Sequence, residues 1–93
     1  MANEVRASHI LVKSEQEARD LKTRIENGED FGAVAKQHSS CPSGQSGGDL
    51  GYFGKGMMVP EFETAAFGAE KNQVSEPVKT QFGYHLIKVT DQR

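Results

Sequence analysis

The chain has 93 residues, of which 35% are hydrophobic and 26% are charged, and its formal net charge is −2. This composition is ordinary for one small soluble domain, and its charges are interspersed, without the lysine/arginine block of a nucleic-acid-binding surface. The apolar runs are too short to span a bilayer and residues 1–12 lack the apolar core of a secretory signal, so we expect a cytoplasmic protein with no nucleic-acid or membrane partner.

The first predicted element is a strand over residues 5–13. Its three consecutive apolar residues, Ile10–Val12, are typical of a strand that is covered on both faces. Because side chains alternate along a strand, one face should carry Val5, Ala7, His9 and Leu11.

Two helices are predicted next. Ser14 followed by Glu17 fits a capping box at the start of the first helix, and Gly28 is suited to the position just after its end. Asp30 can cap a second, shorter helix over residues 31–38.

Residues 39–56 are rich in glycine, serine and proline, which predicts turns around a short strand at residues 50–53. Pro60 suits the first turn of a further helix that Gly68 ends.

Two strands are predicted to close the chain. Residues 73–79 can form a short strand that Pro77 restricts to an edge of the sheet or to a strand start, and residues 84–90 form the last strand. The order of elements is strand, two or three helices, strand, helix, strand, strand. It predicts an α/β or α+β domain with one mixed or antiparallel sheet.

His9 and His85 lie in the two most strand-like segments, each flanked by aliphatic residues. A buried imidazole needs a hydrogen-bond partner. The two histidines can satisfy each other if the first and last strands are neighbours, or each can be a separately bonded core residue.

Cys41 is the only cysteine, which rules out an intrachain disulfide and a multi-cysteine zinc site. Its turn-rich surroundings are common at functional sites. Three interpretations stay open: a buried filler, a reactive thiol that acts with a histidine, and a polar member of a binding site.

Several apolar residues lie near turns and can belong either to the core or to a shallow apolar cup that binds a flexible peptide. They are Leu50, Met57, Met58, Phe62 and Phe82. The glycine-rich stretch beside them matches neither phosphate-binding motif, so we expect no phosphate binding there.

Five segments at matching spacing give the chain a resemblance to the parvulin family of peptidyl-prolyl cis/trans isomerases, over about residues 5–90. The segments are ASHILV at 7–12, FG with AK and Ser at 31–39, CPSG with GGDLG at 41–51, MVP with two phenylalanines at 58–67, and VSEPV with FGYHLI at 74–87.

The resemblance implies an α+β domain over residues 1–93 with the parvulin (FKBP-like) fold, in which three to four helices surround a four-stranded antiparallel sheet. It also implies a monomeric isomerase that assists folding by rotating X-Pro bonds without cofactor, metal or covalent intermediate. Its partners would be proline-containing peptides and unfolded or partly folded proteins. The alternative within the same fold is a non-catalytic peptide-binding or chaperone module.

The resemblance also assigns the polar residues of the site. His9 and His85 match the paired histidines under the floor of the family's site, and Thr80 matches a hydroxyl position in their network. Cys41 matches a position often held by cysteine or aspartate. We expect the histidines to act structurally, in a hydrogen-bond network that fixes Cys41 and Thr80.

The apolar residues of the site follow in the same way, because Leu50, Met58 and Phe62 match the family's proline pocket. Phe82 stands where some relatives carry a serine, so the site is less polar there. Lys13 leads directly into an acidic helix start without the basic loop of phosphate-selecting relatives, so we expect a preference for unphosphorylated substrates.

Overall fold

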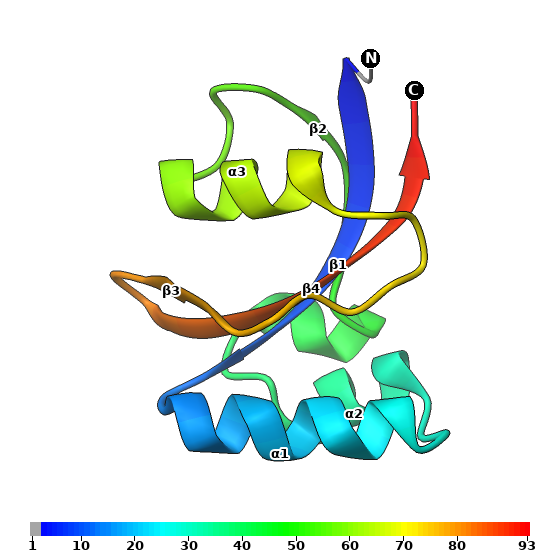
Figure 1. Cartoon of the computed structure of the whole chain (residues 1–93), viewed down its shortest axis with the longest axis vertical. Coiled ribbons are helices and arrows are strands. Elements are labelled where there is room, and N and C mark those ends of the chain that lie inside the picture. The colour runs from blue at the N-terminus through cyan, green and yellow to red at the C-terminus, as the bar shows by residue number, and fades with distance from the viewer. Residues whose placement is uncertain (1–2) are drawn as a thin grey trace.

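The computed structural model describes residues 3–93, so that Met1 and Ala2 of the expected domain lie outside the described part of the chain. One antiparallel sheet of four strands, in the order β2-β1-β4-β3, forms its centre (Figure 1). The strands are β1 (Glu4–Val12), β2 (Asp49–Gly54), β3 (Val78–Thr80) and β4 (Gly83–Gln92). The helices are α1 (Glu15–Glu26), α2 (Phe31–His38), α3 (Pro60–Gly68) and the short 3-10 helix η1 (Pro42–Ser46). This is the expected α+β class.

The helices lie on both sides of the twisted sheet, with α1 and α2 together at one end and α3 at the other (Figure 1). Because side chains alternate along the two central strands, the core is divided into two clusters, one on each side of the sheet. On the side of α1 and α2, the core cluster consists of Ile10, Val12, Ala18, Leu21, Phe31, Val34, Ala35 and Leu86. On the side of α3, it consists of Val5, Ala7, Phe53, Phe62, Ala66, Ile87 and Val89. Ile10 and Val12 are buried on the side of α1 and α2, whereas Leu11, on the opposite face, is only half-buried. The prediction that Ile10–Val12 is covered on both faces is therefore confirmed for one face only.

The predicted helix starts are confirmed by their hydrogen bonds. The Ser14 hydroxyl oxygen accepts from the backbone N–H of Glu17 at 3.1 Å, and the Asp30 carboxylate accepts from that of Ala33 at 2.9 Å. Pro60 occupies the first turn of α3. These local interactions determine where each helix enters the fold.

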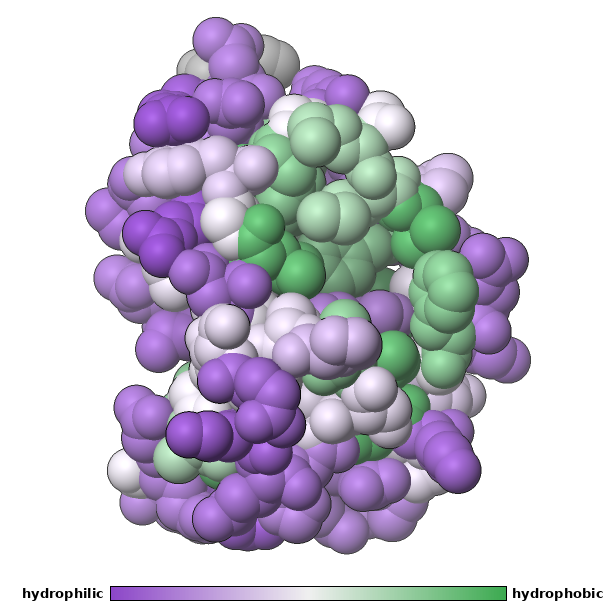
Figure 2. Space-filling view, turned by 180° about the vertical axis from the view of Figure 1, so that it is seen from behind, coloured by the Kyte–Doolittle hydropathy of each residue, from purple (hydrophilic) through white to green (hydrophobic). Residues whose placement is uncertain are grey.

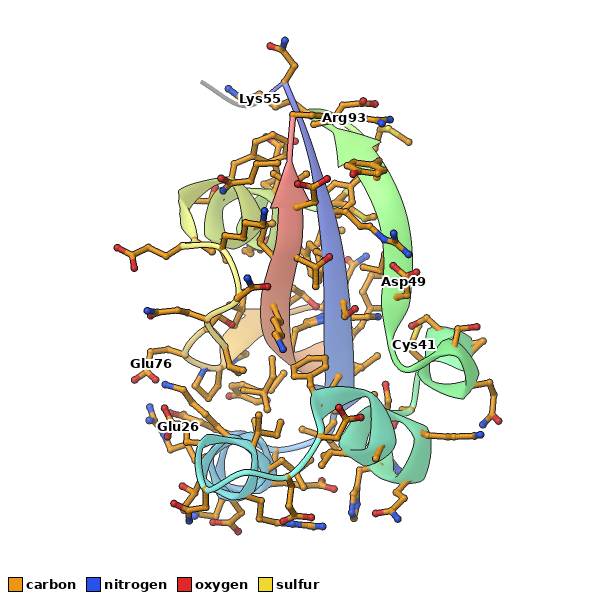
Figure 3. All side chains as sticks on the ribbon, turned by 90° about the vertical axis from the view of Figure 1, so that its right-hand side faces the viewer. Glu26, Cys41, Asp49, Lys55, Glu76 and Arg93 are labelled. Atoms are coloured by element: carbon orange, nitrogen blue, oxygen red, sulfur yellow. The ribbon has the colours of Figure 1, made fainter. Side chains whose placement is uncertain are left out.

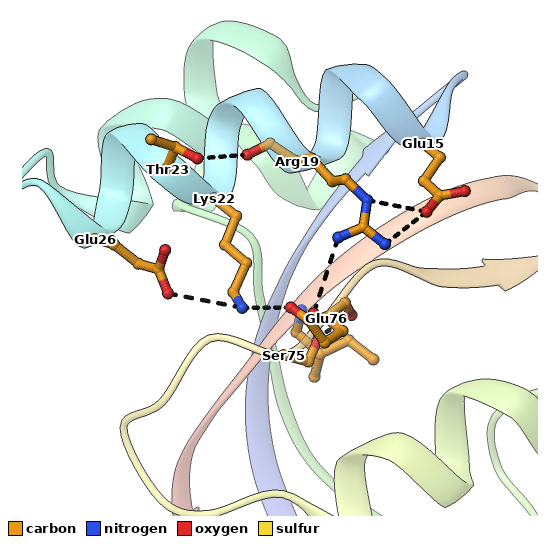
Figure 4. Close-up of polar contacts among 8 residues, drawn as sticks. Glu15, Arg19, Lys22, Thr23, Glu26, Ser75 and Glu76 are labelled. Atoms are coloured by element: carbon orange, nitrogen blue, oxygen red, sulfur yellow. Dashed lines mark hydrogen bonds and ion pairs between the residues drawn. The ribbon is translucent and has the colours of Figure 1, made fainter.

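Ion pairs attach α1 to the segment that precedes β3 (Figure 4). Lys22 Nζ lies 2.5 Å from a Glu76 carboxylate oxygen, and Arg19 lies 2.7 Å from Glu15 and 3.8 Å from Glu76. Because the Glu76 side chain is largely exposed, these pairs orient the segment more than they stabilise the fold.

Two segments differ from the prediction. Residues 42–46 form the 3-10 helix η1 where only turns are expected. The strand expected over residues 73–79 is shorter, because only Val78–Thr80 joins the sheet and Val74 makes an isolated bridge with Lys88. Pro77 lacks an N–H donor, which accounts for the interruption before β3.

Close approach of the chain beside β1 requires glycine at position 48. Gly48 has φ +85°, and a Cβ there would lie 2.4 Å from the carbonyl oxygen of His9. The Gly48 carbonyl in turn accepts a hydrogen bond from the His9 backbone N–H at 3.0 Å. Only glycine lets η1 and β2 run this close to the strand that carries His9. None of the helices in the described part of the chain has the length and hydropathy needed to cross a membrane.

Candidate active site

An apolar pocket of about 490 Å³ opens beside the start of α3, between the loop that follows β2 and the turn between β3 and β4. Figure 2 shows the apolar surface patch and its hollow on one face of the molecule. Its lining contains no Asp, Glu, Lys or Arg. Of the eight residues predicted for the site, it includes His9, Cys41, Leu50, Met58, Phe62, Phe82 and His85. Thr80 is buried behind His85.

His9 and His85 form a hydrogen-bonded pair beneath the pocket. They come from the two central strands, where His9 lies opposite Ile87 and Leu11 opposite His85, so that the histidines are diagonal neighbours. Their Nδ1 atoms are 2.9 Å apart, and the rings lie nearly parallel, at 17°. Both side chains are buried. The predicted contact between the two histidines is confirmed.

Two hydroxyl groups complete this arrangement. Ser43 Oγ lies 3.1 Å from His9 Nε2, and Thr80 Oγ1 lies 2.7 Å from His85 Nε2. Every imidazole nitrogen therefore has a partner, in the sequence Ser43–His9–His85–Thr80. A hydrogen bond between the two Nδ1 atoms holds one proton, so the tautomers are coupled. When one ring donates through Nδ1, its own Nε2 accepts from a hydroxyl, and the other ring donates through Nε2.

This geometry keeps both imidazoles neutral. Burial, and then repulsion from His85, lowers the pKa of His9 to about 4. Burial also lowers the pKa of His85. A charged imidazole would carry its charge in a place with little water, and charging both rings would put two protons between the Nδ1 atoms. Near neutral pH the pocket thus lies above an uncharged polar pair.

Phe62 forms the floor of the pocket. It is only 3% exposed, and its ring lies edge-on to both imidazoles, 5.5 Å from His9 and 5.3 Å from His85 between ring centroids. Leu50 and Met58 are half-buried and form the walls. Phe62 thus belongs both to the core under α3 and to the site. The sequence left core and binding cup as alternatives for the apolar residues, and for Phe62 both are true.

Cys41 lies at the start of η1 (Figure 3), half-buried in the pocket wall. Its backbone N–H donates to Ser39 Oγ at 3.3 Å, and the described side chains give its thiol no hydrogen bond to either imidazole. The expectation that the histidine network fixes Cys41 is therefore wrong, and the residue in that place is Ser43.

Ser43 is a site residue that the sequence motifs did not predict. Its signal was the position two residues after Cys41 in the same turn-rich motif. The 3-10 turn of η1, which was not predicted, brings its hydroxyl to His9. In residues 3–93, no three His, Cys, Asp or Glu side chains gather in a group that could hold a metal ion.

The chain is similar to known proteins over nearly its whole length. A family model described as the PPIC-type PPIase domain matches residues 1–93. The foldase protein PrsA of Geobacillus sp. (strain WCH70) is 59% identical over 88 residues, which cover 94% of this chain and 32% of that protein. The chain thus spans about a third of the length of such curated relatives.

Solved structures are similar as well. The peptidylprolyl isomerase PrsA of Bacillus anthracis superposes with a TM-score of 0.96 at 47% identity, over 99% of this chain and 43% of that one. NmPin, the parvulin of Nitrosopumilus maritimus, superposes with a TM-score of 0.89 at 46% identity, over 98% of this chain and 99% of that one.

Proposed function

This chain belongs to the family of PPIC-type peptidyl-prolyl isomerase domains, the parvulins, and we propose that it accelerates the cis/trans isomerisation of X-Pro bonds in flexible polypeptides by a noncovalent route. One observation carries the proposal: an apolar pocket without charged side chains lies over a neutral, hydrogen-bonded imidazole pair. Assistance to protein folding follows from the same activity, because slow proline isomerisation limits the folding of many chains.

Rotation about the X-Pro bond can be accelerated by the polarity of the surroundings alone. Rotation about a peptide C–N bond has a barrier of about 18–20 kcal/mol, because resonance gives the bond double-bond character. The planar amide is charge-separated, whereas the twisted amide has lost that resonance. An apolar pocket therefore disfavours the planar forms relative to the twisted one. Lowering the barrier by about 4–6 kcal/mol gives roughly 10³–10⁴-fold acceleration.

Each group has a distinct part in this proposal. Leu50, Met58 and Phe62 hold the proline ring, because they form the walls and floor of the pocket. The imidazole pair supports the floor through its edge-on contacts with Phe62. Cys41 supplies polarity near the substrate carbonyl. No bond needs to be broken, and the thiol has no hydrogen-bonded base among the described residues, so a hydrolase that uses Cys41 as a nucleophile is disfavoured.

The test is exchange NMR on an X-Pro peptide, with and without the chain. We expect acceleration by the parent, a clear loss in Met58→Ala, and substantial activity in Cys41→Ser. Loss of activity in Cys41→Ser together with a trapped thioester in the parent would overturn the noncovalent route. Binding of the peptide without any acceleration would show the alternative, a non-catalytic peptide-binding module.

We further propose a preference for unphosphorylated substrates. β1 ends at Val12 and α1 begins at Glu15, which leaves no room for a basic loop, and the pocket lining offers a phosphate no cation. Faster turnover of a phosphoserine-proline peptide than of its serine counterpart would contradict this. A monomeric state and a cytoplasmic location stay predictions, which sedimentation and cell fractionation test.

A further inference from the structure

The pairing of β1 with β2 ends at Ser8, and beyond it this edge of β1 is bonded to the segment at residues 39–48. The backbone N–H of Leu11 donates to the hydroxyl oxygen of Ser39 at 3.0 Å. The Leu11 carbonyl accepts from the backbone N–H of Ser40 at 2.8 Å. A backbone N–H inside a fold needs an acceptor, and here a side-chain hydroxyl takes the place of a carbonyl on a partner strand. The segment that forms one wall of the pocket is attached to β1 at this point.

Ser39 joins three parts of the chain. Its backbone N–H donates to the Ala35 carbonyl at 2.9 Å, which fixes it to the last turn of α2. Its hydroxyl oxygen has two lone pairs, and it accepts both from the N–H of Leu11 at 3.0 Å and from the N–H of Cys41 at 3.3 Å. One oxygen atom therefore sets the position of Cys41 relative to α2 and to β1.

The backbone of Cys41 is held on its other side as well. Its carbonyl accepts from the N–H of Gly44 at 2.9 Å, within the turn of η1. Among the described side chains, neither imidazole is bonded to the thiol, because the hydroxyl that reaches His9 is that of Ser43. The place of the thiol in the pocket wall therefore depends on the backbone bonds on either side of it, and Ser39 makes the bond that connects this backbone to β1.

We propose that Ser39 is a positioning residue of the isomerase, whose hydroxyl holds Cys41 where the thiol supplies polarity to the substrate carbonyl. The inference rests on the proposed function, which gives Cys41 that part. Without the hydroxyl, two backbone N–H groups lose their acceptor, and the wall that carries Cys41 can move relative to β1. A displaced polar group favours the twisted amide less. The proline ring still meets Leu50, Met58 and Phe62, so removal of the hydroxyl should lower kcat and leave KM nearly unchanged.

The test is a double-mutant cycle that measures kcat and KM for one X-Pro peptide. Ser39→Ala should lower kcat about fivefold and change KM by less than about twofold. In a Cys41→Ala background the same change should alter kcat by less than about twofold, because the group that Ser39 positions is gone. Ser39→Thr keeps the hydroxyl and should restore most of kcat. Ser14→Ala is the matched control: it also removes a hydroxyl that accepts from a backbone N–H, but at the start of α1, away from the pocket lining, and it should keep the kcat and KM of the parent.

Native-state hydrogen exchange gives a second measurement that does not depend on activity. The amides of Leu11 and Cys41 should exchange at least about tenfold faster in Ser39→Ala, while the other amides of β1 change no more than they do in Ser14→Ala. An equal fall of kcat in both backgrounds, or unchanged exchange of the two amides, would overturn the positioning role and leave the isomerase standing. Faster exchange in a chain that accelerates no peptide would refute the proposed function and still show that Ser39 holds Cys41. If Ser39→Ala does not fold, Ser39→Cys, in which a weak acceptor replaces the hydroxyl, takes its place in both measurements.

Discussion

Acid should destabilise this domain through the imidazole pair before it does so through the carboxylates. The pKa of His9 is lowered from its ordinary value of 6.5 to about 4 in the folded chain. Between these values the unfolded chain binds more protons than the folded chain, so the free energy of unfolding falls as the pH falls. From pH 7 to pH 4.5 the loss from His9 is about 2.5 kcal/mol. This is roughly a sixth to a half of the unfolding free energy of about 5–15 kcal/mol that is typical of native proteins.

The pH window identifies the source of the effect. Ion pairs and hydrogen bonds also lower the pKa of Asp49 and Asp91. Glu29 and Glu76 have a lowered pKa for the same reason. The stability that these carboxylates contribute is present above their unfolded pKa and is lost mainly below about pH 5. A decline between about pH 6.5 and 5 therefore belongs mainly to the histidines. The lowered pKa of His85 acts in the same direction as that of His9.

The assay is urea unfolding at pH 7, 6, 5 and 4.5, on the parent and on the double variant His9→Asn/His85→Asn. The parent should lose at least about 2 kcal/mol more than the double variant over this range. All other titratable groups are the same in both proteins, so the difference between them reports the histidine pair. An equal loss in both would refute the reasoning. If the double variant does not fold, an NMR pH titration of the parent measures the pKa of His9 directly. A titration midpoint near pH 6.5 for His9 in the folded chain would refute the reasoning.

Three further predictions concern single positions. Gly48→Ala should lower the free energy of unfolding by more than about 3 kcal/mol, because the new Cβ would clash with the His9 carbonyl oxygen. Gly51 also has a positive φ but lies in open space, so Gly51→Ala should lower it by only about 1 kcal/mol in the same urea assay. Ser43→Ala leaves a buried nitrogen of His9 unpaired, which should lower the free energy of unfolding by about 1–3 kcal/mol, measured by thermal unfolding. An unchanged melting temperature would contradict the hydrogen-bond network of Ser43, His9, His85 and Thr80. Glu76→Gln should shift the urea midpoint slightly at low salt and not at all at about 1 M NaCl, since exposed ion pairs are screened; a shift that persists in high salt would show a packing role instead.

The sequence alone determined the features that depend on residues close together in the chain. Ser14, Asp30 and Pro60 mark helix starts because their contacts lie within one turn. Alternation placed His9 and His85 on inward faces, since side-chain direction in a strand depends only on parity. The family motifs added which apolar residues to expect near the proline.

Only the tertiary structure decided which of these residues meet. The pairing of β1 with β4 brings together two imidazoles 76 positions apart, and no local rule requires that pairing. Ser43, rather than Cys41, reaches His9 because η1 turns there and Gly48 lets the chain pass close to β1. Phe62 belongs both to the core and to the floor of the pocket. Hydropathy cannot tell a core residue from a pocket residue, because both are apolar and only the packing determines which apolar surface stays accessible to a ligand.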